Sequence, residues 1–194
     1  MKPANTIFFR DAVRDDALFI ARCILAAVGE FDFSDMDRDS VQQQIIMEDC
    51  AMDRSLYSYT HTRIAECDGK PVGCLLSYPG EEYAELRKAT WDRIDRATGR
   101  SYRSISDTET EAGEYYLDSL AVIPEYRGQG IGRRLFDDSI HRAMAMGYNR
   151  ITLIVEKDHP KLIEYYKSMG FEPENELTFL GERYVRCALD TARQ

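Results

Sequence analysis

The residues with the clearest chemical potential form a glycine-rich stretch, which reads Tyr126-Arg127-Gly128-Gln129-Gly130-Ile131-Gly132-Arg133-Arg134. Glycine has no Cβ, so its backbone can approach a ligand closely. The unpaired N–H groups of a helix's first turn, together with the helix dipole, favour a bound anion. Because the stretch follows an apolar, strand-like run and opens a helical pattern that extends to about Met146, it predicts a phosphate-binding turn between a strand and a helix.

Two common nucleotide-binding motifs do not fit this stretch. A P-loop would need Gly-Lys-Ser/Thr at a fixed spacing, and the chain has none here. A dinucleotide fingerprint would need G-x-G-x-x-G and an acidic strand end further on, whereas the glycines here follow G-x-G-x-G. A glycine triplet alone is also typical of an ordinary loop, so the flanking sequence decides its meaning.

Two further motifs flank the turn. Leu120-Ala121-Val122-Ile123-Pro124-Glu125-Tyr126 precedes it, and Tyr165-Tyr166-Lys167-Ser168-Met169-Gly170-Phe171 follows one helix and one strand later. Together they resemble the GNAT superfamily of acyl-CoA-dependent N-acyltransferases, which carries LAV-x-P-x-Y-R-G-x-G-I-G followed by Y-x-x-x-G-F. The match is close from about Tyr115 to Phe171, and the opening residues 9–16 also look like the family's first strand and the start of its first helix.

The resemblance implies acetyl-CoA as the co-substrate and assigns a set of cofactor contacts. The backbone of Leu120, Ala121 and Val122 would bond the pantetheine amides like an added strand. The turn would hold the pyrophosphate through residues Arg127, Gly128, Gln129, Gly130, Ile131, Gly132 and Arg133. His159 stands where the family often has an asparagine that bonds the cofactor, so it either replaces that contact or caps the helix that Pro160 opens.

Tyr166 is the candidate general acid. It lies four residues before Gly170, where the family's acid commonly sits, and a neutral phenol can protonate the departing thiolate. Tyr165 offers a rival phenol. The structural alternative for Tyr166 is an aromatic contact within the core.

The candidate general bases lie on the preceding strand. Strand alternation, without a bulge, puts Glu114, Tyr116 and Asp118 on one face. Tyr116 stands where one common family carboxylate would be, so Asp118 is the first candidate and Glu114 the second. A strand carboxylate that is simply paired or solvated fits either position equally well.

Periodicity and turn signals predict the elements that position these residues. The predicted strands are 7–10, 62–67, 70–78, 114–123, 150–155 and 182–189, and the predicted helices are 15–28, 39–52, 81–96, 131–146 and 160–169. This order indicates an α/β fold, a mixed central sheet flanked by helices, in a single domain 1–194 with an insertion at about 80–112. The resemblance implies that the parallel central strands 114–123 and 150–155 splay apart to admit the pantetheine arm.

Composition excludes some classes of binding partner and predicts the compartment in which the protein works. The net charge of −9 argues against nucleic acid and against anionic membranes. No apolar run approaches a membrane span and the N-terminus lacks a signal core, so we expect a cytoplasmic protein. The five scattered cysteines and three histidines predict no disulfide framework and no metal. Trp91 in the insertion could pack on its own domain or on a partner subunit, which is compatible with a homodimer.

The predicted function is N-acetyl transfer from acetyl-CoA to a primary amine by direct attack, without an acyl-enzyme. A small-molecule acceptor is favoured because the insertion could act as a lid. An acidic loop adds weak support, since carboxylates and aromatics suit a cationic amine, although a solvated loop is the simpler interpretation; it holds Phe31, Asp32, Phe33, Asp35, Asp37 and Asp39. The alternatives are a protein or peptide N-acetyltransferase with an open groove and a non-catalytic CoA-binding regulator.

Overall fold

The structure, a computed structural model, describes residues 6–29, 32–33, 41–99 and 107–193. The strands are β1 (Ile7–Asp11), β2 (Thr62–Cys67), β3 (Lys70–Pro79), β4 (Tyr115–Val122), β5 (Arg150–Glu156), β6 (Glu172–Phe179) and β7 (Glu182–Asp190). The helices are α1 (Ala17–Ala27), α2 (Val41–Cys50), α3 (Gly80–Thr98), α4 (Ile131–Ala145) and α5 (Pro160–Lys167). Among the described residues, no helix has both the length and the apolar character needed to cross a bilayer.

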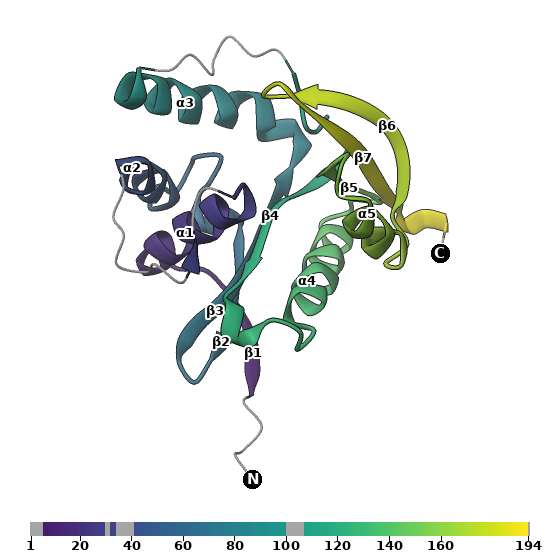
Figure 1. Cartoon of the computed structure of the whole chain (residues 1–194), viewed down its shortest axis with the longest axis horizontal. Coiled ribbons are helices and arrows are strands. Elements are labelled where there is room, and N and C mark those ends of the chain that lie inside the picture. Colours follow the sequence, from purple (N-terminus) through teal and green to yellow (C-terminus); the bar gives the residue numbers. More distant parts are fainter. Residues whose placement is uncertain (1–5, 30–31, 34–40, 100–106, 194) are drawn as a thin grey trace.

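One mixed sheet runs through the molecule, with helices on both faces (Figure 1). Its seven strands lie in the order β1-β2-β3-β4-β5-β7-β6. One core lies between the sheet and α1, α2 and α3, and a second lies on the α4 and α5 side. The predicted α/β class with a mixed sheet is therefore confirmed, and each predicted helix is present with ends shifted by a few residues.

The central parallel strands separate after a short contact. β4 and β5 pair only at Tyr115 with Ile151 and at Tyr116 with Thr152. Beyond Tyr116, the β4 backbone faces β5 without a ladder, while its other edge stays paired to β3. The predicted splay is present, and it leaves backbone donors and acceptors of β4 open at the middle of the sheet.

A bulge interrupts β4 at Asp118. Leu117 pairs with Ser77 and Ser119 pairs with Leu76, so Asp118 is an extra residue in the ladder. The bulge reverses the alternation of side chains along the strand. Tyr116 and Ala121 consequently belong to the same core although they are an odd number of positions apart. The assumption of an unbroken alternation was therefore wrong beyond Tyr116.

The C-terminal part of the sheet contains a strand that the sequence did not predict. β6 is an edge strand paired with β7, and the pairing is irregular between Pro173 and Glu176. Its first five residues are exposed, so it lacks the apolar alternation that marks a half-buried strand. Proline is tolerated there because an edge strand has one unpaired side.

Helix α3 occupies the first half of the predicted insertion and packs on its own chain. Trp91 is 5% exposed, and its ring lies 6.0 Å from that of Phe179 on β6. The Arg87 guanidinium carbon lies 3.8 Å from the centre of the indole ring. On its other side, α3 reaches α2 through an ion pair between Arg93 and Asp49. The open question about Trp91 is thereby answered in favour of intramolecular packing, with α3 spanning from α2 to the β6–β7 hairpin (Figure 1).

We expect Gly80→Ala to destabilise the protein by about 2 kcal/mol or more, as overpacked sites do. A Cβ at Gly80 would lie 1.9 Å from the carbonyl oxygen of Glu111, and the Gly80 N–H donates to the Glu114 carbonyl at 2.8 Å. Without this contact, alanine in a helix would be the more stable residue. Urea unfolding measures the change, and a midpoint equal to or above that of the parent would contradict the close approach.

Candidate active site

The glycine-rich turn leaves a row of backbone donors open. Gly128 and Gly130 have φ values of 72° and 74°, a conformation that costs glycine little and other residues more. Gly130 is the N-cap of α4, and the Arg134 N–H donates to its carbonyl at 3.1 Å. Within the described chain, the N–H groups of residues 128–133 donate to no backbone carbonyl. This geometry suits an anion at the start of α4.

The side chains of the turn are mostly engaged with the protein itself. Arg127 Nε donates to the Val122 carbonyl at 2.8 Å, and Gln129 Nε2 donates to the Glu125 carbonyl at 3.3 Å. Arg133 forms an i,i+4 ion pair with Asp137. The main attraction for a phosphate here would therefore come from backbone N–H groups and the helix dipole.

The predicted pantetheine-binding residues lie on the splayed part of β4. Leu120, Ala121 and Val122 follow the last β4–β5 pair. Ala121 is 8% exposed and packs in the core, so its side chain packs while the strand's backbone edge stays open. A Cβ at Gly132 would lie 3.3 Å from Leu120 Cδ2, so glycine at this position lets α4 approach β4 beside the opening. The residues present fit an extended ligand arm running from the strand gap to the turn.

Tyr166 lies on α5 in the core that covers one side of the strand gap. Its ring centre is 5.3 Å from that of Phe136 and 6.1 Å from that of Phe171. No hydrogen bond to its hydroxyl is found among the described residues. Burial raises the pKa of the Tyr166 phenol above its usual range, so it stays protonated at neutral pH. The rival Tyr165 is 39% exposed.

His159 takes the N-cap position of α5, but its side chain makes no capping hydrogen bond. His159 therefore caps the helix through its backbone, since the Leu162 and Ile163 N–H groups donate to its carbonyl at 3.0 and 3.2 Å, and its role toward the cofactor stays a prediction. Its Nε2 lies 3.5 Å from a carboxylate oxygen of Glu156. With Asp158, these residues form a group whose ligand atoms lie within 4.8 Å of one another. Three such side chains are able to bind a metal ion, but acidic clusters without a metal are common on protein surfaces. We therefore assign no metal site to these residues.

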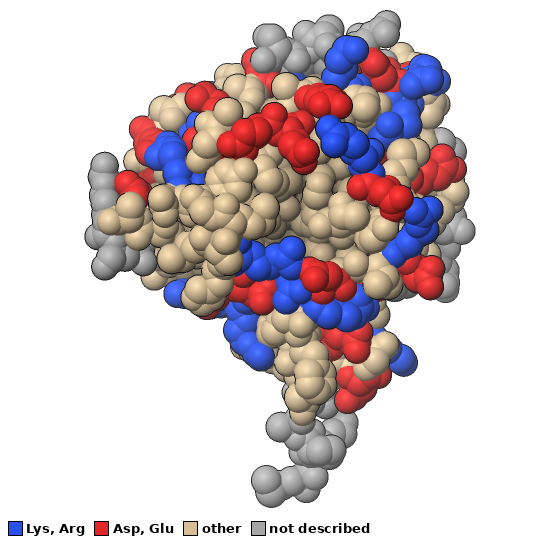
Figure 2. All heavy atoms as spheres, turned by 180° about the vertical axis from the view of Figure 1, so that it is seen from behind, with Lys and Arg blue, Asp and Glu red and all other residues tan. Residues whose placement is uncertain are grey.

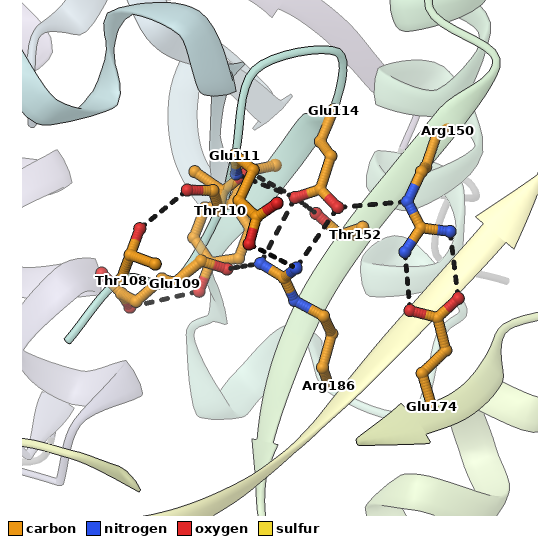
Figure 3. A network of polar contacts seen from close by, with 10 residues as sticks. Thr108, Glu109, Thr110, Glu111, Glu114, Arg150, Thr152, Glu174 and Arg186 are labelled. Carbon is orange, nitrogen blue, oxygen red and sulfur yellow. Dashed lines mark hydrogen bonds and ion pairs between the residues drawn. The ribbon is translucent and has the colours of Figure 1, made fainter. Parts of the chain in front are cut away.

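Glu114 is held in a network of ion pairs and hydrogen bonds (Figure 3). Its carboxylate accepts from Arg150 Nε at 3.1 Å and from Arg186 at 3.3 Å. It also accepts from the Thr110 hydroxyl at 3.0 Å and from Thr152 at 3.3 Å. These donors occupy both carboxylate oxygens and tie the group to β5, to β7 and to the loop before β4. The structure favours the paired-carboxylate alternative for Glu114.

We expect Arg186→Met to lower the free energy of unfolding by about 3 kcal/mol, because it leaves the buried Glu114 carboxylate short of a partner. The Arg186 side chain is 10% exposed, and its Nη2 also donates to the Glu109 carbonyl at 2.7 Å. Urea unfolding of the variant is compared with that of Arg183→Met on the exposed end of β7. Equal midpoints for the two variants would contradict a structural role for the network.

Asp118 meets a second carboxylate that the sequence did not single out. Asp118 accepts from the Tyr78 hydroxyl and from Ser119 Oγ. Glu109, in the loop before β4, accepts from the Tyr83 hydroxyl at 2.7 Å and from the Tyr116 hydroxyl at 3.1 Å. The two carboxylates and the three tyrosines form what we call the tyrosine–carboxylate cluster: Tyr78, Tyr83, Glu109, Tyr116 and Asp118.

Burial sets the protonation of the two carboxylates in this cluster. It raises the pKa of Asp118 and, reinforced by the nearby Asp118 charge, raises the pKa of Glu109 to about 8. Two close like charges titrate as a pair, so the values belong to both groups together. Glu109 escaped the sequence analysis because it lies in a polar stretch without periodicity. The available hint was a pair of tyrosines, Tyr78 and Tyr116, in two otherwise largely apolar strands.

The acid and base candidates lie on opposite faces of the sheet. Tyr166 packs in the α4 and α5 core, whereas Tyr78, Tyr83 and Tyr116 belong to the core under α1, α2 and α3. The gap between β4 and β5 lies between the two faces (Figure 1). On the side opposite to Figure 1, uncharged atoms surround a hollow with charged side chains around it (Figure 2). A group held in the gap could thus be reached by a proton acceptor from one face and a donor from the other.

The acidic loop contributes little to this picture. Asp32 is exposed and Phe33 is buried against the α1 core. Phe31, Asp35, Asp37 and Asp39 lie outside the described residues, so the predicted role of the loop stays a prediction.

Comparison with known proteins supports this architecture. Residues 26–171 match the model of the Acetyltransferase (GNAT) family. Thialysine N-epsilon-acetyltransferase of Sus scrofa is 25% identical over 166 residues, which cover 85% of this chain and 84% of that protein. The chain spans 16% and 48% of the length of the first two curated relatives it matches.

Solved structures share the fold. One acetyltransferase crystal structure superposes with a TM-score of 0.76 at 25% identity and covers 95% of this chain and 99% of that one. An N-acetyltransferase from Staphylococcus aureus Mu50 gives a TM-score of 0.75 at 20% identity, with 94% and 100% covered.

Proposed function

The chain belongs to the GNAT family of acetyltransferases, and from this we propose that it transfers an acetyl group from acetyl-CoA to a primary amine of a small molecule. The observation that carries the proposal is the opening between β4 and β5, which leads to a turn with open N–H groups. Acetyl-CoA supplies an activated thioester carbonyl when bound. The free thiols, all five buried, fit the reducing cytoplasm predicted for the protein.

The chain's own residues would bind, orient and exchange protons. The N–H groups of the turn would hold the pyrophosphate, and the splayed edge of β4 would bond the extended arm and direct an N–H at the thioester oxygen. Holding two substrates in register supplies much of the rate enhancement in such a reaction. Tyr166 would donate a proton to the leaving sulfur, and the amine would attack the carbonyl carbon directly.

A small acceptor is favoured over a peptide by the position of α3. This helix is fixed at one side by the Arg93–Asp49 ion pair and at the other by Trp91 against Phe179. A segment anchored in this way would limit access to the α1–α3 face, where the amine has to arrive.

A free-thiol assay with acetyl-CoA and an amine panel tests the proposal, with mass detection of products. The panel spans polyamines, amino sugars, amino acids and short peptides. Turnover on small amines is the expected result, and turnover on peptides alone would indicate a protein-modifying enzyme instead. Binding of acetyl-CoA without turnover on any acceptor would favour the regulator.

A further inference from the structure

We infer that the acceptor is an alkylammonium ion whose charge is bound between Glu109 and Asp118, and that this carboxylate pair takes the proton the amine must lose. The inference deepens the proposed function and rests on it. It assigns a role to Glu109, which lies outside the family motifs, and it names the chemical class of the acceptor as an aliphatic amine that is cationic at neutral pH.

The first argument is that both carboxylates are satisfied by neutral donors only. Each of the four carboxylate oxygens accepts a hydrogen bond from one hydroxyl group. The donors to Asp118 are Tyr78 and Ser119, and the donors to Glu109 are Tyr83 and Tyr116. Within the described part of the chain, no lysine or arginine forms an ion pair with either group. Two carboxylates that lie largely out of water without a counter-ion are costly when ionised.

The second argument is that this chain pairs three of its other buried carboxylates with arginine. Asp16 bonds Arg10, Asp49 bonds Arg93, and Glu114 bonds both Arg150 and Arg186. Only a ligand cation would complete the tyrosine–carboxylate cluster in the same way. Glu109 and Asp118 are half-buried as residues, whereas the three tyrosines around them are buried.

None of the cationic side chains near Glu109 forms an ion pair with its carboxylate in the described part of the chain. Arg87 on α3 donates to the Asp107 carbonyl and lies over the Trp91 and Tyr83 rings, 3.8 Å and 5.5 Å from their centres. Its charge is the smallest of the influences on the pKa of Glu109, after burial, the Asp118 charge and the two tyrosine hydroxyls, and among the described residues it forms no ion pair with that carboxylate. Arg186 on β7 bonds the Glu109 main chain and the Glu114 carboxylate. The tyrosines stay neutral because burial raises their pKa values; they are Tyr57, Tyr78, Tyr83, Tyr116 and Tyr184.

The surroundings also suit an ammonium ion. The Tyr78 ring centre lies 5.7 Å from that of Tyr116 and 6.2 Å from that of Tyr83, the latter pair being stacked. Aromatic rings attract cations electrostatically, and phenol oxygens are acceptors as well as donors. An aliphatic ammonium fits this chemistry, whereas a neutral aromatic amine or an alcohol would leave the carboxylates without a counter-charge.

The position of Asp118 connects the cation site to the reaction. Asp118 is the bulge residue of β4 and lies two residues past the last β4–β5 pair, where the proposed function puts the thioester. The ammonium nitrogen would pass a proton to a carboxylate oxygen, and its freed electron pair would form the C–N bond. The C–S bond breaks, and the sulfur takes that electron pair and a proton from Tyr166. The nitrogen, still positively charged after the C–N bond has formed, releases its second proton to solvent, and solvent returns a proton to Tyr166.

The loop that carries Glu109 is fixed before any ligand arrives. Arg186 donates to the Glu109 carbonyl at 2.7 Å, and Thr110 donates to Glu114 at 3.0 Å, as Figure 3 shows. Arg186 is thus a positioning residue for Glu109. Preorganised carboxylates need no rearrangement when the cation binds.

Binding is tested on the full chain without coenzyme, with butylamine and butan-1-ol as matched cationic and neutral probes. At pH 7.5, butylamine should raise the melting temperature relative to an equal concentration of sodium chloride, and butan-1-ol should not. Glu109→Gln and Asp118→Asn should lose the butylamine effect. Glu85→Gln on the exposed face of α3 should keep it. An effect of butylamine that is equal in Glu109→Gln and the parent would overturn the inference.

Turnover and pH supply the second test. Glu109→Gln should lower kcat/KM for an alkylamine at least about tenfold with acetyl-CoA affinity unchanged. The parent should lose activity as pH falls through about 8, the pKa of Glu109, because a protonated pair cannot accept a proton; the variant should lack this limb. If the parent acetylates amines and Glu109→Gln matches it at every pH, the inference fails and the proposed function stands. If butylamine binding depends on Glu109 but no amine is acetylated, the proposed function fails alone.

Stability against pH separates a functional pair from a structural one. The pKa of Glu109 is raised above its unfolded value of 4.5, so its stabilising contribution is fully present below pH 4.5 and is lost as pH rises through about 8. The melting temperature of Glu109→Gln should therefore rise relative to that of the parent between pH 5 and pH 9. A constant difference over this range would contradict an unpaired buried carboxylate.

Discussion

Gly130→Glu is expected to weaken acetyl-CoA binding by about 1,000-fold or more, a loss of about 4 kcal/mol. Gly130 is the N-cap of α4, and the N–H groups that follow it are the open donors of the turn. A Cβ and a carboxylate at this point would obstruct the backbone and bring negative charge to the place where a pyrophosphate has to bind. Calorimetric titration with acetyl-CoA measures the effect.

The control for this variant is Gly99→Glu. Gly99, at the C-cap of α3, has φ 71° and ψ 7°, and Gly130 has φ 74° and ψ 8°. Neither glycine has a heavy atom within 4 Å of the position a Cβ would take. Both variants therefore carry the same backbone strain, about 1–2 kcal/mol, and the same new charge. If Gly99→Glu loses affinity as strongly, or if Gly130→Glu retains it, the pyrophosphate assignment is wrong.

The turn and its flanks could be predicted from sequence because their signals are local. A glycine at positive φ before an amphipathic helix is determined by residues that are neighbours in the chain. Gly128, Gly130 and the start of α4 at Ile131 were accordingly found where the pattern put them. The same holds for the β2–β3 hairpin around Asp68 and Gly69, both of which have positive φ.

The carboxylate pair could not be predicted because its parts come from distant segments. Tyr78 lies near the end of β3, Tyr83 lies on α3, and Glu109 lies in the following loop. Only tertiary packing brings them to Asp118. The bulge in β4 has a similar origin, since it depends on the register with β3 and leaves no mark in the strand's own pattern. Edge strand β6 was missed because exposed, acidic residues carry little information on strand pairing.

Tyr166→Phe is expected to lower kcat by about 100-fold, the lower end of the range for general acid catalysis, with acetyl-CoA affinity unchanged. Phenylalanine keeps the ring contacts with Phe136 and Phe171, so the change removes the hydroxyl alone. Because burial raises the pKa of this phenol, it remains a proton donor across the neutral range, and no loss of activity from its own ionisation should appear below pH 10.

Tyr165→Phe is the matched control, since it removes a phenol from the adjacent position on the same helix. Tyr165 is 39% exposed, so this variant should turn over like the parent. Steady-state rates at saturating acetyl-CoA separate the two, and thermal unfolding checks that both variants fold. If Tyr166→Phe keeps full turnover, the residue is an aromatic core contact; if Tyr165→Phe alone is impaired, the neighbouring phenol is the acid. Either result would move the proton donor away from Tyr166 and leave the cofactor turn and the carboxylate pair to be tested on their own variants.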